Sequence, residues 1–561
     1  KGGFNPRTRE QVKPLGKEQK QALREWIDAG APPLRGDRTR ISLDDYTRLL
    51  RRDQSSLPRP EQEDLVYVDF HAVYNNPRYS NVQVSAFANA TLKLLNGLDP
   101  RATQVQRIGG GAAVIVDSQQ VPIAVRFNPA RFNLDQIDID RIIALTNRQD
   151  AANRFDCDVP AIPVLDFLQI ASADDFFNPI KETFESGYSN IMLRRLFQDK
   201  GIIDPNDNER LVFNPIAKAD FIAGNGVGFS NVSEFTLFDV MAARGLDLND
   251  LDILFNKGND NERLVRGCLL NSDVSAANRC IDRFALSDLR GGSFYVSWDT
   301  LSTGSVKDKA DFFAANFVGP ANPPDAPLVR QENAFVVDGG EAIFQLPNRM
   351  QGYVVYNGKL QLVTNPPTFA VLNPTDSERG NFISARACSS CHANYTIAFE
   401  DAALKVAFKG INGASNEEAG FLFKIVQDKA AWDFTFSDDK ARYLEELKKV
   451  YYSLAEGGSV PDGIYSLGSQ YLFDLENEDI VAELGLLDIE ELEDAVDNDT
   501  NLTAELRSIF GGGMSRENFT VNYQKLVANV SSSNADFLRG CVSRVVSGPG
   551  EFGQDGEEGG N

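Results

Sequence analysis

The spacing of apolar residues predicts helices along much of the chain. In residues 17–29, Leu23, Trp26 and Ile27 recur at helical spacing, and Gly30 follows as a stop signal. Ser42 is a plausible N-cap for the next helical pattern. Helical patterns then occupy residues 42–52, 82–98, 132–148, 162–172, 177–197, 402–410, 417–430, 439–455, 477–486, 488–496, 501–510 and 515–530.

Strand patterns are fewer and shorter. Residues 112–127 predict two strands around a turn, and residues 341–364 are β-rich. Within the second stretch, Asn357-Gly358 lies between two apolar alternating runs, which is typical of a type I′ hairpin turn. The pattern therefore predicts an α+β protein that is predominantly α-helical, with small antiparallel β-hairpins.

Length and charge narrow the class of protein. The chain has 561 residues and a net charge of −24, which disfavours nucleic acid and anionic membrane surfaces as partners. No run of eighteen apolar residues predicts a transmembrane helix. No signal peptide is visible, and Lys1 is interpreted as a processed or truncated start, so a cleaved signal remains open. The Gly-rich acidic tail, 546–561, is expected to be disordered.

One short motif carries recognisable chemistry. Cys388, Cys391 and His392 have the spacing C-x-x-C-H. Two thiols at this spacing can each add to a vinyl group of one porphyrin, and the following histidine then supplies an axial imidazole. A redox dithiol gains nothing from that histidine, and structural zinc needs a second pair of ligands. We therefore expect one covalently bound haem c in the C-terminal half of the chain.

The other axial ligand is limited by composition. The chain has two histidines, His71 and His392. A bis-histidine iron would therefore use His71 as its second ligand, unless another chain contributes one. The alternatives are a methionine, an open sixth site for gas or peroxide chemistry, or a His71 that is merely packed. The candidate methionines are Met192, Met241, Met350 and Met514.

Four further cysteines remain after the motif. Our preferred pairing is Cys268 with Cys280, which are close in sequence, and Cys157 with Cys541. Haem c attachment and disulfides both indicate a location outside the cytoplasm, either periplasmic or extracellular.

Two acidic loops, 204–214 and 258–267, resemble each other in sequence. Asp and Asn oxygens suit calcium, but neither loop has the EF-hand spacing, so solvated turns are the preferred interpretation.

The chain resembles a family of large secreted bacterial c-type cytochromes. The matching stretches are "REWIDAGAP" (24–32), "VYVDFHAVYNN" (66–76), "LKLLNGLDP" (92–100), "DVSAANRCIDR" (273–283), "GSFYVSWD" (292–299), "GGEAIFQLPNRMQGYVVYNGK" (339–359), "ACSSCHA" (387–393), "VAELGL" (481–486) and "LRSIFGGGMSRENFTVNYQKLV" (506–527). The resemblance implies a haem-bearing electron carrier, and it places a family histidine at His71. The family string has Leu where this chain has Met350, which weakens Met350 as a ligand.

The same resemblance suggests a domain organisation. Residues 1–36 would be the terminal helix of a cytochrome-c-like domain and a linker, because the W-I-x-x-G-A-P helix normally ends such a domain. Residues 37–380 would form a large α+β module containing His71, 381–545 the helical haem segment, and 546–561 the tail.

Three functions follow as hypotheses. The leading one is an extracytoplasmic c-type cytochrome that passes single electrons to other redox proteins through a low-spin iron. The second is a structural subunit of a cytochrome polymer, a homo-oligomer or a larger redox complex. The third is a peroxidase-like haem enzyme with an open sixth site.

Overall fold

The structure is a computed structural model of the chain. It describes residues 38–62, 64–98, 102–132, 134, 139, 159–171, 237, 241, 246, 264–269, 278–286, 292–300, 339–358, 388, 392, 394–396, 429–454, 474–486, 488–497, 513–530 and 541–542. Several predicted features lie outside these residues: the helices at 17–29, 177–197, 402–410 and 501–510, the acidic loop 204–214, most of the loop 258–267, and the tail 546–561.

The chain divides into two compact units, each assembled from separate stretches of sequence. The C-x-x-C-H unit comprises Lys1–Pro33, Asn89–Ile108 and Leu168–Gln470. The His71 unit comprises Leu34–Ala88, Gly109–Phe167 and Tyr471–Asn561. The described residues of the segment 37–380 therefore contribute to both units. The predicted boundaries at 36, 380 and 545 stay a prediction.

The His71 unit is built on a mixed five-stranded sheet with the order β10-β4-β1-β3-β2. Its strands are β1 (Val66–Asp69), β2 (Ala112–Val116), β3 (Pro122–Phe127), β4 (Val159–Pro163) and β10 (Cys541–Val542). β1 runs parallel to β4 and antiparallel to β3, so Val68 pairs with both Ile162 and Val125. All four residues of β1 are buried, as expected for a central strand covered on both faces.

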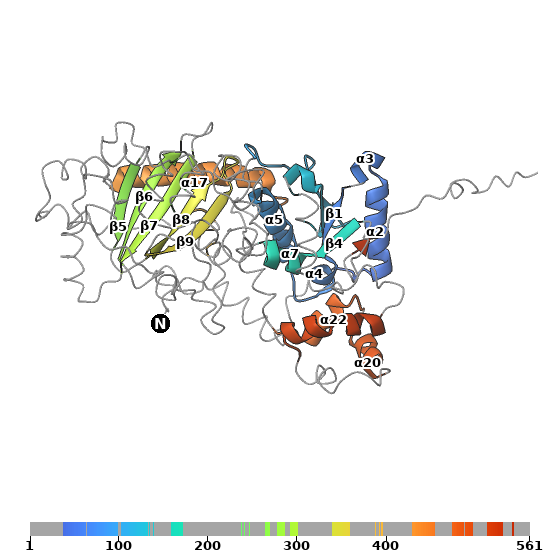
Figure 1. Cartoon of the computed structure of the whole chain (residues 1–561). Coiled ribbons are helices and arrows are strands. Elements are labelled where there is room, and N and C mark those ends of the chain that lie inside the picture. The colour runs from blue at the N-terminus through green and yellow to red at the C-terminus, as the bar shows by residue number, and fades with distance from the viewer. Residues whose placement is uncertain are drawn as a thin grey trace, which may run out of the picture. The chain divides into compact units, whose positions relative to one another are not determined.

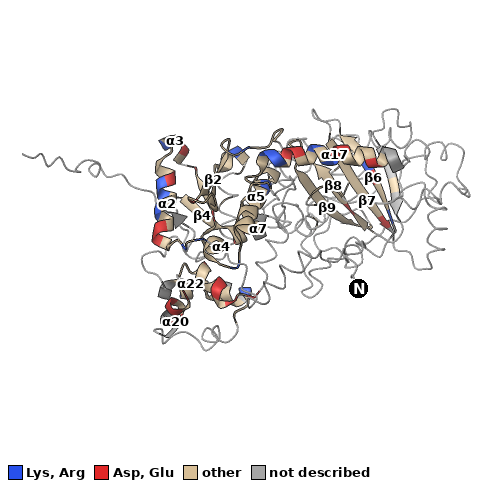
Figure 2. Cartoon of the chain, turned by 180° about the vertical axis from the view of Figure 1, so that it is seen from behind, with Lys and Arg blue, Asp and Glu red and all other residues tan. Residues whose placement is uncertain are grey.

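The helices of this unit are α2 (Leu43–Ser55), α3 (Arg59–Gln62), α4 (His71–Asn75), α19 (Asn477–Glu483), α20 (Ile489–Asp497) and α22 (Arg516–Val530), with a 3-10 turn at Pro129–Phe132. Helix α2 contacts β10 and helix α4 contacts β3, whereas α20 and α22 lie apart from the sheet, in a group that meets α4 through α19 (Figure 1). The predicted cap is confirmed, because the backbone N–H of Asp45 donates to Ser42 Oγ at 3.2 Å. Charged side chains of both signs lie along α2, which buries Leu43, Tyr46 and Leu50 (Figure 2).

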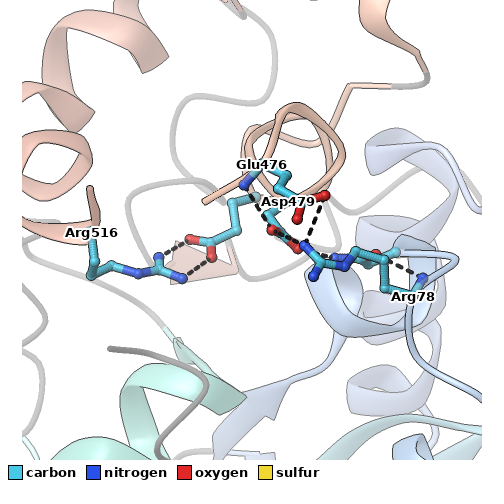
Figure 3. Close-up of polar contacts among 6 residues, drawn as sticks. Arg78, Glu476, Asp479 and Arg516 are labelled. Carbon is cyan, nitrogen blue, oxygen red and sulfur yellow. Dashed lines mark hydrogen bonds and ion pairs between the residues drawn. The ribbon is translucent and has the colours of Figure 1, made fainter. Parts of the chain in front are cut away.

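Ion pairs hold α19 within the His71 unit. Arg78, in the loop after α4, donates to Asp479 at 2.8 Å and lies 3.4 Å from Glu476 (Figure 3). Arg516, at the start of α22, donates through two nitrogens to the two oxygens of Glu483, at 2.8 and 2.7 Å. The second pair is largely removed from water, with side-chain exposures of 9% and 5%. A bidentate pair in this setting fixes the orientation of both helices.

The C-x-x-C-H unit is built on an antiparallel five-stranded sheet with the order β5-β6-β7-β8-β9. Its strands are β5 (Leu264–Leu269), β6 (Asn278–Leu286), β7 (Gly292–Thr300), β8 (Gly339–Gln345) and β9 (Gln351–Asn357). Helix α17 (Lys429–Val450) lies along this sheet (Figure 1). Two further helices, α5 (Asn81–Gly97) and α7 (Val164–Ala171), have residues in both units.

The prediction of a predominantly helical protein with small hairpins is wrong. Two five-stranded sheets form the framework, and about 46% of the described residues lie in helices against 27% in strands. The pattern missed β5, β6 and β7 because β6 and β7 carry charged residues at buried positions, namely Arg279, Asp282 and Asp299. Such residues are rare in strands, so the pattern did not reveal these strands.

The two strand predictions have different outcomes. The strands around a turn at 112–127 are confirmed as β2 and β3. In the 341–364 stretch, the hairpin turn lies between β8 and β9, where the backbone N–H of Leu346 donates to the carbonyl of Met350. Asn357 instead ends β9, and the residues after Gly358 lie outside the described part of the chain.

Replacing Arg516 with alanine is expected to lower the free energy of unfolding by about 3 kcal/mol, because it leaves the Glu483 carboxylate buried without its partner. The matched control is Arg48→Ala, which removes an exposed pair with Asp45 and should cost less than about 1 kcal/mol. Urea unfolding of both variants measures the difference. Equal losses would contradict a structural role for the buried pair.

Candidate functional site

The sheet of the C-x-x-C-H unit has one polar face and one apolar face. Side chains alternate between the two faces along each strand. One face, called the polar face here, carries Arg279, Arg283, Ser293, Tyr295, Ser297, Asp299, Glu341, Gln345, Gln351 and Tyr353. All of these except Arg283 are buried. On the opposite face, Phe294 and Phe344 stack with ring centroids 5.1 Å apart. A sheet with buried polar residues on one face is unusual and marks that face as a candidate site.

His392, the last residue of the C-x-x-C-H motif, lies beside the polar face. The ring centroid of His392 is 6.5 Å from that of Tyr353 on β9. The backbone N–H of Tyr395 donates to the carbonyl of His392 at 3.0 Å. The hydroxyl of Tyr395 in turn is hydrogen-bonded to Ser293 on β7. Cys388 is buried and is not in a disulfide, whereas Cys391 lies outside the described residues.

A buried ion cluster, formed by Arg279, Asp299 and Glu341, lies on the same face. The guanidinium of Arg279 donates to both oxygens of Asp299, at 2.7 and 2.6 Å, and to Oε1 of Glu341 at 2.6 Å. The hydroxyl oxygen of Ser297 accepts the backbone N–H of Glu341 at 2.9 Å. The cluster therefore holds one cation between two carboxylates.

The two carboxylates differ in their electrostatics. Burial would raise the pKa of Glu341, but Arg279 and His392 outweigh this effect and hold that pKa below its usual value. Burial raises the pKa of Asp299, and this effect is larger than the opposing effect of the ion pair with Arg279. Burial lowers the pKa of Arg279, but the two carboxylates outweigh this effect and raise that pKa. Glu341 is therefore the carboxylate on which negative charge is better stabilised.

The imidazole of His392 has an unused polar atom. Its Nδ1 is buried and has no hydrogen-bond partner among the described residues. Burial lowers the pKa of His392, and the carboxylate of Glu341 opposes this shift. Histidine binds metals as a neutral imidazole. One ring nitrogen binds the metal, and the N–H of the other nitrogen needs a hydrogen-bond acceptor.

Helix α17 covers the polar face beside the motif. Asp439 on α17 accepts from Nε and Nη2 of Arg283, both at 3.0 Å, and from the Tyr295 hydroxyl at 2.7 Å. Tyr395 lies among the rings of Tyr295, Phe436 and Tyr443, with centroid distances of 6.0, 6.3 and 5.4 Å. Tyr395, three residues after His392, is thus packed against both sheet and helix by aromatic contacts.

His71 occupies a buried position in the other unit. Its Nε2 lies 3.1 Å from the carbonyl oxygen of Ile41 and 2.9 Å from Nδ2 of Asn75. The backbone N–H of His71 donates to Asp69, and its ring packs edge-on against Tyr46 with centroids 4.9 Å apart. For His71 to bind iron through Nε2, the contacts with Ile41 and Asn75 would have to be replaced. Its role as an axial ligand stays a prediction.

The remaining sequence candidates are distributed as follows. Cys280 is disulfide-bonded, and Cys268 stands directly opposite it in the β5–β6 register. Cys541 lies in β10, while Cys157 and Met192 lie outside the described residues. Met241, Met350 and Met514 are all buried.

Sequence reasoning missed the ion cluster. Glu341 was present in the stretch "GGEAIFQLPN", but nothing local distinguishes it from a surface glutamate. The signal that could have found it is the repeated spacing of two among polar residues in neighbouring strands, such as Arg279, Arg283, Ser297 and Asp299. Recognising that spacing requires knowing that the segments are strands at all.

The buried His71 generates a pH dependence of stability. Burial lowers the pKa of His71 to about 4, against about 6.5 in an unfolded chain. Between these values the unfolded chain binds a proton that the folded chain does not. Stability therefore falls as the pH is lowered through this window, by about 3 kcal/mol in total from this group. Urea unfolding from pH 7 to pH 4 should show a steeper loss for the wild type than for His71→Gln, and parallel curves would contradict a buried neutral His71.

Among the described residues, no helix is long and apolar enough to span a membrane, and no cluster of three or more metal-ligating side chains is present. Comparison of the chain with protein-family models, with curated proteins and with solved structures found no match. The resemblance to secreted c-type cytochromes therefore stays an expectation based on the residues themselves.

Proposed function

We propose that the protein is a c-type cytochrome that works outside the cytoplasm and transfers single electrons through one covalently attached haem. The observation that carries this proposal is the C-x-x-C-H spacing of Cys388, Cys391 and His392, together with the contact of His392 with Tyr353 on the polar face. A bound haem supplies an iron that changes its charge by one electron. The residues around it bind, orient and shield that group.

The residues present fit such a group. Cys388 and His392 are four positions apart, and each of the two residues has a helical conformation. Cys388 is buried without a disulfide, so its thiol is chemically intact. The Tyr353 ring beside His392 is a flat surface of the kind that packs against a porphyrin. Cys391 would provide the second thioether.

The surrounding residues have separable roles in this proposal. His392 would hold the iron from one side. Tyr395, packed among the aromatic residues of α17 and β7, would keep the motif in position and exclude water. The buried cluster of Arg279, Asp299 and Glu341 would set the electrostatic field at the haem. Burial and nearby charge are the means by which a protein adjusts a haem potential.

The cysteines support a location outside the cytoplasm. Cys280 is disulfide-bonded, and structural disulfides persist in oxidising compartments. A periplasmic or cell-surface location is also where a net charge of −24 would favour association with basic redox partners. Other redox proteins are the proposed partners.

Optical spectroscopy of the purified protein tests the proposal directly. We expect one haem c per chain, retained on denaturing gels because the attachment is covalent. Cys388→Ala with Cys391→Ala should abolish that retention, and Ser437→Ala, at an exposed position of α17, serves as the control. A wild-type protein without covalent haem would refute the proposal.

The second axial ligand is tested in the same experiment. If His71 binds the iron, the wild type is low-spin and does not bind carbon monoxide, and His71→Ala becomes high-spin. If reduced wild type binds carbon monoxide at once, the sixth site is open and His71 is not a ligand. Asn75→Ala is a useful companion, because it removes a polar contact of the His71 ring without removing the imidazole.

A further inference from the structure

One buried nitrogen on the polar face lacks a partner among the described residues. It is Nδ1 of His392, which has no hydrogen-bond acceptor there. Buried polar groups are normally paired, because each unpaired group costs free energy. The carboxylate of Glu341 lies on the same face and accepts from Arg279 through Oε1. A carboxylate has two oxygens, so Glu341 can accept a further hydrogen bond through Oε2.

The strand register brings these groups together. His392 packs against Tyr353, which pairs with Ile343 across β8 and β9. Glu341 lies two residues before Ile343 and so projects from the same face, as the diagonal neighbour of Tyr353. Diagonal neighbours are about 7–8 Å apart, within reach of long side chains. The charges of Glu341 and His392 also influence each other's protonation.

Charge balance favours the same arrangement. Arg279 is one cation that donates to two carboxylates, Asp299 and Glu341. An excess of buried negative charge requires a positive partner. In the proposed cytochrome, the iron held by His392 is more positive in its oxidised state than in its reduced state.

We propose that Glu341 is a positioning residue that accepts a hydrogen bond from Nδ1 of His392 when Nε2 binds the haem iron, and that it thereby lowers the reduction potential of the haem. This inference rests on the proposed function. Metal-bound histidines generally donate their second N–H to a carboxylate, a carbonyl or water, and a carboxylate makes the imidazole a stronger ligand. A stronger, more negative ligand environment stabilises the oxidised iron. Arg279 holds Glu341 in place and prevents it from swinging away.

The test compares the reduction potential of the wild-type haem protein with that of Glu341→Gln. Glutamine has nearly the same shape and keeps a carbonyl oxygen, so it removes the charge with little change in packing. The expected result is a retained haem with a higher potential. The low-spin ferric electron paramagnetic resonance spectrum should also shift, because it reports the ligand strength of the imidazole.

Two control variants separate this role from a general effect of charge. Asp299→Asn removes the other carboxylate on Arg279, and Glu445→Gln removes an exposed carboxylate from α17. Both should shift the potential less than Glu341→Gln and leave the paramagnetic spectrum unchanged. Should Glu341→Gln fold poorly, Glu341→Asp keeps the charge but shortens the side chain, and it should give an intermediate rise in potential.

The outcomes are distinguishable. A wild-type protein with covalent haem whose potential and spectrum are unchanged in both Glu341 variants overturns this inference and leaves the proposed function intact. Equal shifts in Glu341→Gln and Asp299→Asn also overturn it, because they indicate a diffuse effect of charge. A wild type without covalent haem overturns both proposals.

Discussion

A charge buried in the face of a sheet must be paired. In the C-x-x-C-H unit this requirement determines how the charged side chains of the polar face are arranged. Arg279 is 5% exposed and is shared between Asp299 and Glu341, which come from two other strands. Removing Arg279 would leave two carboxylates without their shared cation in a poorly solvated site. The cluster thus ties β6, β7 and β8 together through their side chains as well as through their backbone hydrogen bonds.

The same face is tied to α17 by a second set of polar contacts. Asp439 is buried and accepts three hydrogen bonds, two from Arg283 and one from Tyr295. These contacts fix the helix along the sheet, and the aromatic residues between them enclose Tyr395. The motif is consequently held between a charged region and an aromatic region. A site of this kind combines a fixed local field with exclusion of water, which is what control of a haem potential requires.

Both the small number of histidines in the chain and the contacts of the His71 ring bear on the role of His71. Its rarity in the sequence favours a functional role, since the chain has two histidines. Its surroundings satisfy it as a neutral side chain, with Ile41, Asn75 and Tyr46 in contact with the ring. A neutral imidazole is also the form that binds iron. Ile41 and Asn75 occupy Nε2 of His71, so its role as an axial ligand stays a prediction.

The sequence by itself determined the features that depend on neighbouring residues. The spacing of Cys388, Cys391 and His392 by itself predicts haem attachment, and this stays a prediction. Ser42 caps α2 because a cap acts within one helical turn, and the strands around the turn at 112–127 follow from short alternating runs. These features needed no knowledge of distant segments.

Only the tertiary structure decided which distant residues share the polar face. Arg279, Asp299 and Glu341 come from three strands, and Asp439 comes from a helix far along the chain. Each one alone resembles an ordinary surface charge, so the local pattern did not reveal the cluster, and it predicted a mainly helical protein. Strand register determines which side chains become neighbours, and register is set by long-range pairing. For this physical reason the spacing of the motif could be recognised in the sequence, whereas the charged residues around it could not.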